Sequence, residues 1–125
     1  MSYKGWETFV FKASGALAAS AAGDAIFIPP EFKGLTARIH VTAQSGTTPT
    51  LNVKFQGSFD GTNFFDLNYP HGTTAAAFAE YAAATGKKSI TFESYVPWMR
   101  IYSTIGGTSP SFTFKVEATT KEQYE

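Results

Sequence analysis

The sequence predicts an all-β protein: a two-sheet antiparallel β-sandwich, jelly-roll-like, with at most one short helix. Three observations predict this fold. Short segments of alternating apolar and polar residues recur at spacings of about 8 to 12 residues, turn-forming residues separate them, and one stretch occurs twice. The 125 residues are expected to form a single domain, with an N-terminal arm and small-residue loop over 1–24 and a polar tail over 120–125.

The repeated stretch covers residues 38–58 and 100–118. Both copies begin with Arg-Ile and contain a Gly-Thr-Thr/Ser-Pro motif, at 46–49 in the first copy and 107–110 in the second. Apolar and polar residues alternate on both sides of each motif, which is typical of two strands joined by a turn. We therefore expect two β-hairpins, packed pseudo-symmetrically with one in each sheet.

The chain before the first repeat is expected to begin with a strand that is apolar on both faces. Phe9 and Phe11 fall on one face of this strand, and Trp6 and Val10 fall on the other. Such a strand is either covered on both sides or lies as an arm against a partner. Trp6, Phe9 and Phe11 are therefore candidate subunit-interface residues.

Two further segments complete this part of the chain. Residues 13–23 are almost all small and indicate a loop with room for one helical turn. Residues 25–28 form a short strand that ends at two prolines, because proline cannot donate to a strand ladder.

The chain between the repeats contains one clear reversal and one ambiguous segment. Asp60-Gly61 marks a tight turn between two strands within 56–67. Residues 73–85 are rich in alanine and could equally form a helix or a long loop. A further strand is expected over 89–96.

Composition excludes several classes of function. The 10 basic and 10 acidic residues are spread along the chain and give no footprint for nucleic acid or an anionic membrane. The chain has no cysteine, which excludes a thiol nucleophile, a disulfide scaffold and thiolate metal sites. No apolar run resembles a signal peptide or a membrane helix, so we expect synthesis in a host cytoplasm without export.

Candidate metal and catalytic residues are sparse, and no cofactor is expected. Asp60, Asn63 and Asp66 offer oxygen ligands of the kind calcium prefers, but the carboxylates are too few, and a turn stabilised by aspartate is the preferred interpretation. His40 and His71 stand alone, without zinc-ligand spacing. No nucleophile elbow or carboxylate pair is evident, and we therefore expect a non-enzymatic protein.

Several aromatic residues are candidates for an exposed face. Trp98, Arg100 and Tyr102 share one face of a strand, and Tyr95 lies nearby in the sequence. We single out Tyr95, Trp98 and Tyr102, since outward-facing aromatic rings can stack on sugars. Aromatic residues in a small β-domain more commonly lie in a core or an interface.

The sequence resembles a class of small virion proteins of tailed bacteriophages. The resemblance lies between residues 38 and 118, and its motifs are Ser58-Phe59-Asp60-Gly61-Thr62-Asn63-Phe64-Phe65-Asp66-Leu67, Trp98-Met99-Arg100-Ile101-Tyr102 and Gly107-Thr108-Ser109-Pro110-Ser111-Phe112. It implies a capsid decoration protein that binds the head exterior and stabilises the shell. It also implies a location on the virion, contact with the major capsid protein or other virion subunits, and a symmetric homo-oligomer, with a trimer favoured.

Two alternatives remain. The Ser-x-Asp-Gly pattern also occurs in discoidin-like sandwiches, so a carbohydrate-binding module is the second interpretation, with a glycan as ligand. Those modules usually carry a closing disulfide, which this sequence cannot form. A tail component of the virion is the other alternative.

Overall fold

The computed structural model describes residues 6–29, 34–67, 79–93 and 96–121, without the side chains of residues 6, 92, 93 and 121. Within these residues every regular element is a strand, as the sequence predicts. The strands are β1 (Trp6–Leu17), β2 (Ala21–Ala22), β3 (Ile26–Phe27), β4 (Gly34–Ser58), β5 (Phe65–Asp66), β6 (Ala79–Ala82), β7 (Gly86–Glu93) and β8 (Trp98–Lys121).

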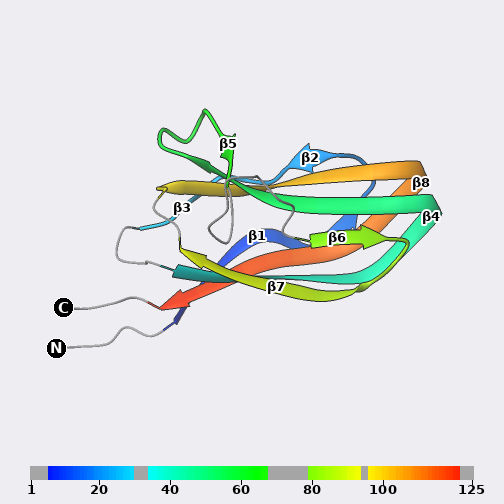
Figure 1. The fold of residues 1–125 in the computed structure, drawn as a ribbon, viewed down its shortest axis with the longest axis horizontal. Coiled ribbons are helices and arrows are strands. Elements are labelled where there is room, and N and C mark those ends of the chain that lie inside the picture. Colours follow the sequence, from blue (N-terminus) through cyan, green and yellow to red (C-terminus); the bar gives the residue numbers. More distant parts are fainter. Residues whose placement is uncertain (1–5, 30–33, 68–78, 94–95, 122–125) are drawn as a thin grey trace.

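The strands form one antiparallel hydrogen-bonded sheet that folds over into two layers (Figure 1). The sheet folds over because its two long strands, β4 and β8, run side by side and bend together near their midpoints. The first layer contains β1, the second half of β8, the first half of β4, and β7. The second layer contains β2 and β3, the first half of β8, the second half of β4, and then β5 and β6. The result is the predicted β-sandwich.

The two repeats are not hairpins, and this prediction is wrong. Each copy is a bent strand whose two halves lie in different layers and pair with the other copy: Ser45 lies opposite Ser111, and Thr50 lies opposite Gly106. Apolar and polar residues alternate in the same way in a bent strand and in a hairpin. The sequence pattern therefore could not distinguish these two structures. Strands that pass from one sheet to another commonly do so at bends of this kind.

The two Gly-Thr-Thr/Ser-Pro motifs form the bends and interlock. Gly46 and Gly107 adopt φ values of 109° and 111°, which side chains rarely tolerate. A Cβ atom on Gly46 would lie 2.6 Å from the carbonyl oxygen of Ser109, and one on Gly107 would lie 2.7 Å from the carbonyl oxygen of Thr48. Each glycine thus lies against the motif of the other copy, which is the structural reason for the repeat.

Both layers contribute to a single core between them. Phe11 from the first layer meets Phe55 from the second edge to face, with ring centroids 5.1 Å apart. The fully buried large side chains come mainly from the bent strands: Leu35, Ile39, Val41, Leu51, Val53, Phe55, Met99, Ile101, Phe112, Phe114 and Val116. The outward residues between them form two separate outer faces.

Within the ambiguous segment over 73–85, residues 79–82 form a strand and residues 83–85 are irregular. Ala79 and Tyr81 are buried while Glu80 and Ala82 are exposed, which is the period of a strand rather than a helix. Pairing with residues 50–53 satisfies the backbone groups on the side that faces β4. Residues 73–78 of this segment, for which a helix and a loop were equally expected, lie outside the described residues.

The two chain ends differ from the sequence-based expectation. β1 continues to Leu17 through two irregularities in its pairing, so the expected arm is a strand of the first layer over residues 6–17. Lys12 supports the irregular part by donating from Nζ to the carbonyls of Ala13, Gly15 and Phe114. At the other end, Thr120 is buried within β8, so the polar tail begins later than expected.

Candidate functional site

The outer face of the second layer carries Trp98 and Tyr102, two of the three sequence-predicted aromatic residues. Met99, Ile101 and Ser103 face the core. Because successive side chains of a strand point to opposite faces, Trp98, Arg100 and Tyr102 point outward, and Trp98 and Tyr102 are half-buried.

A polar network covers the middle of this face. The Asp66 carboxylate accepts hydrogen bonds from Lys54 Nζ and Gln56 Nε2, both at 3.0 Å. These hydrogen bonds, first from Gln56 and then from Lys54, lower the pKa of Asp66. Arg100 Nε donates to Gln56 Oε1 at 2.8 Å, and its guanidinium lies 4.0 Å from the ring centre of Phe64. The face is therefore ordered by connected contacts.

Aromatic rings gather at the end of the second layer where β4 ends and β8 begins. Phe27 contacts Trp98 with ring centroids 5.4 Å apart, and Phe59 contacts Phe65 at 5.7 Å. Phe59 is 71% exposed, Phe27 48% and Phe65 42%. We call Phe27, Phe59, Phe65 and Trp98 the aromatic end. Exposed apolar side chains at one end of a sheet are candidates for a contact site.

The turn that carries Phe59 is held by hydrogen bonds. Asp60 Oδ1 accepts from the backbone N–H groups of Thr62 and Asn63, both at 2.8 Å, and Oδ2 accepts from Asn63 Nδ2. These bonds hold the pKa of Asp60 well below its usual range. The hydroxyl of the buried Ser58 donates to Asp60 and accepts from the Gly61 N–H. The reversal predicted at Asp60-Gly61 is confirmed, although it is a connection over residues 59–64 and not a tight two-residue turn.

The predicted oxygen ligands of the candidate calcium site do not meet at one point. Asp60 is engaged by its own turn, whereas Asp66 bonds to Lys54 and Gln56, so the two carboxylates serve different contacts. Within the described ranges, no group of three or more His, Asp or Glu side chains could hold a metal ion. His40 lies on the outer face of the first layer, and His71 is outside the described residues. Over the same ranges, no helix has the length and apolar character needed to cross a membrane.

The candidate interface residues Phe9 and Phe11 differ in how far they are buried. Phe11 is 3% exposed and belongs to the core, so it has no surface to offer a second subunit. Phe9 is half-buried and packs against the core. The side chain of Trp6 and the whole of Tyr95 lie outside the description.

Sequence reasoning missed most of the aromatic end. The sequence predicts a short strand around Phe27, and it predicts a turn between Phe59 and Phe65, but it does not bring these residues to one end of a sheet. A signal was present, since Phe59 directly precedes Asp60-Gly61, and a bulky apolar residue beside a tight turn is poorly placed for burial. Pairing of Phe27 with Trp98 depends on contact between β3 and β8, which the sequence does not specify.

Comparisons with known proteins give little further information. No protein-family model matches the chain, and no curated protein matches it. Among solved structures, the chain is similar to one described under "Bacillus endospore appendages form a novel family of disulfide-linked pili". The sequence identity is 15%, the TM-score is 0.37, and the match covers 94% of this chain and 92% of that one.

Proposed function

We propose that the protein is a non-enzymatic structural protein of a tailed-phage virion, by preference a capsid decoration protein that binds the head exterior. The motifs that resemble this class of virion protein support the proposal. The observation that carries it is the aromatic end, where two ring pairs, Phe27 with Trp98 and Phe59 with Phe65, lie at one end of the second layer and their three phenylalanines are 42% to 71% exposed. Protein interfaces are anchored by aromatic side chains of this kind.

The aromatic end is suited to contact another protein because it is ordered in advance. Phe59 follows the buried Ser58 and precedes the hydrogen-bonded Asp60 turn, and Phe27 packs on Trp98. Ordered side chains lose less conformational entropy on binding than mobile ones. A standard interface buries about 1,600 Å² in total, so the aromatic end would form the centre of a larger contact with the major capsid protein or another virion subunit.

Head binding is the direct test. The purified protein is mixed with phage heads, which are assembled from the major capsid protein whose gene lies closest to the gene for this protein. The heads are then sedimented. We expect the protein to sediment at a fixed ratio to capsid protein and to form a symmetric oligomer, with a trimer favoured, by light scattering. A strict monomer that stays in the supernatant at every concentration would contradict the proposal.

A carbohydrate-binding module is the second candidate. It is favoured by the Trp98 and Tyr102 side chains, which point to one outer face on either side of Arg100, near the amide of Gln56 and the carboxylate of Asp66. Aromatic faces next to polar groups can stack on and hydrogen-bond a sugar. This candidate predicts glycan-array signals that Trp98→Ala and Tyr102→Ala abolish. If protein that binds heads gives no signal on a glycan array, the carbohydrate-binding function is excluded and the structural role remains.

A further inference from the structure

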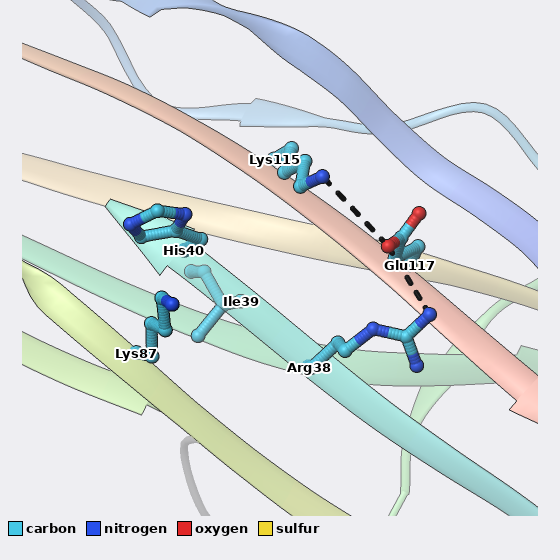
Figure 2. A pocket seen from close by; sticks show the side chains of 6 residues that line it. All are labelled: Arg38, Ile39, His40, Lys87, Lys115 and Glu117. Atoms are coloured by element: carbon cyan, nitrogen blue, oxygen red, sulfur yellow. Dashed lines mark ion pairs between the residues drawn. The ribbon is translucent and has the colours of Figure 1, made fainter. Parts of the chain in front are cut away.

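The outer face of the first layer contains a hollow of about 210 Å³ lined mainly by cations. We call it the basic hollow, and it lies on the opposite layer from the aromatic end. Figure 2 shows side chains from three adjacent strands around it. Its lining residues are Arg38, Ile39, His40, Lys87, Lys115 and Glu117.

Strand register fixes the central row of this hollow. His40 of β4 lies opposite Lys87 of β7 on one side and opposite Lys115 of β8 on the other. Adjacent strands lie about 4.8 Å apart, so the three nitrogen-bearing side chains form one row across the sheet. Arg38 lies two residues from His40 on the same strand and therefore points to the same face.

The positive charge of the hollow is only partly neutralised. Among the described residues that line the hollow, Glu117 is the only acid, and it lies 3.1 Å from Arg38 and 3.8 Å from Lys115. His40 and Lys87 lie on the side away from Glu117 (Figure 2), and among the described residues neither makes a hydrogen bond or ion pair. Their nitrogen atoms remain available to a ligand.

Stability does not explain this arrangement. The whole chain has equal numbers of basic and acidic residues, yet three permanent cations and one acid share this hollow. Grouping like charges on a folded surface raises its free energy by repulsion. A bound anion would remove that cost, and it would gain charge-assisted hydrogen bonds from Arg38 and the two lysines.

We propose that the basic hollow binds an oxyanion with two negative charges, of the phosphate or sulfate type. The excess of positive charge and the available donors of His40 and Lys87 favour such a group over a monovalent anion. The inference does not depend on the proposed function, because it concerns a different face of the protein.

The test is a titration followed by backbone amide chemical shifts, with inorganic phosphate or sulfate added and chloride adjusted to keep ionic strength constant. We expect saturable shifts near residues 38–40, 87 and 115–117. Lys87→Gln should weaken binding about tenfold if it removes a charge-assisted hydrogen bond, and Glu117→Gln should strengthen binding. Lys88→Gln is the matched control, since it removes the same charge from the next residue, whose ammonium bonds instead to the Glu80 carbonyl.

Three outcomes would overturn the proposal. The first is equal shifts with chloride and with the divalent anions, which indicates general screening. The second is equal weakening by Lys87→Gln and Lys88→Gln, which indicates a net-charge effect without a site. The third is weaker binding to Glu117→Gln than to the natural protein. Because Lys87 and Glu117 variants predict opposite changes, a loss of folding in one cannot imitate the expected result.

Discussion

The two outer faces of the sandwich are built on the same bent strands and differ in chemistry. The first layer presents charged side chains and a row of threonines (Thr8, Thr119, Thr36 and Thr91) in register across four strands. The second layer presents the aromatic end and the network around Asp66. The inward residues of both layers are mostly apolar, with Ser103 as a buried polar exception. The repeat therefore specifies the scaffold, and the outward residues specify what each face can contact.

The shared core predicts the largest effect. Phe55→Ala removes a fully buried ring that contacts Phe11 from the other layer, and should lower the free energy of unfolding by about 3 to 5 kcal/mol. Phe59→Ala, at a ring that is 71% exposed, should change it by less than about 0.5 kcal/mol. Urea unfolding measures both, and similar values for the two variants would contradict a core shared between the layers.

The interlocked bends predict the next effect. Gly46→Ala and Gly107→Ala each place a Cβ within 3 Å of the other motif's backbone at a left-handed φ, so each should cost about 2 kcal/mol or more. The two costs should be similar because the bends are related by the repeat. Gly15→Ala serves as control, since its Cβ would meet nothing closer than 3.9 Å. If Gly46→Ala or Gly107→Ala left the free energy of unfolding unchanged, the close packing of the two motifs against each other would be contradicted.

Acid should weaken the second layer's turn. The pKa values of Asp60 and Asp66 are lowered in the folded state, so the unfolded chain takes up protons first as the pH falls below about 4. The stability that both carboxylates contribute is present above that pH and is lost below it. Asp60→Asn should reduce the slope of unfolding free energy against pH between about pH 4 and 2. An unchanged slope would show that the turn does not depend on this ionisation.

The first layer's ion pair predicts the smallest effect. Arg38 and Glu117 are 3.1 Å apart, but their side chains are 44% and 21% exposed. Solvent screens such a pair, so a double-mutant cycle should give a coupling of about 0.2 to 1 kcal/mol that falls with added salt. A coupling energy of several kcal/mol would contradict this expectation, because it would mean that the solvent-exposed Arg38–Glu117 pair contributes substantially to the stability of the fold.

The sequence predicted the strands better than their partners. Alternation located the β-rich segments, and Asp60-Gly61 located a turn, because both are local signals. The pairing of residues 38–58 with residues 100–118 is non-local, and Gly-Thr-Thr/Ser-Pro looks the same in a hairpin turn as in a bend. The register between the two copies and the close approach of Gly46 to Ser109 and Pro110 show that a bend forms.

The candidate site was predicted in part for the same reason. Alternation placed Trp98, Arg100 and Tyr102 on one strand face, and the structure turns that face outward. Phe11 was assigned to an interface because residues 6–12 are apolar on both faces, yet Phe55 covers its ring. The basic hollow draws on three strands that are far apart in sequence, and no local pattern signals it.

The most direct measurement compares head binding by variants of the two outer faces. One variant carries Phe27→Ser, Phe59→Ser and Phe65→Ser at the aromatic end, and the other carries Lys87→Gln and Lys115→Gln in the basic hollow. With urea unfolding showing both folded, co-sedimentation with heads should be lost in the first and kept in the second. Undiminished co-sedimentation of the aromatic-end variant would contradict the account.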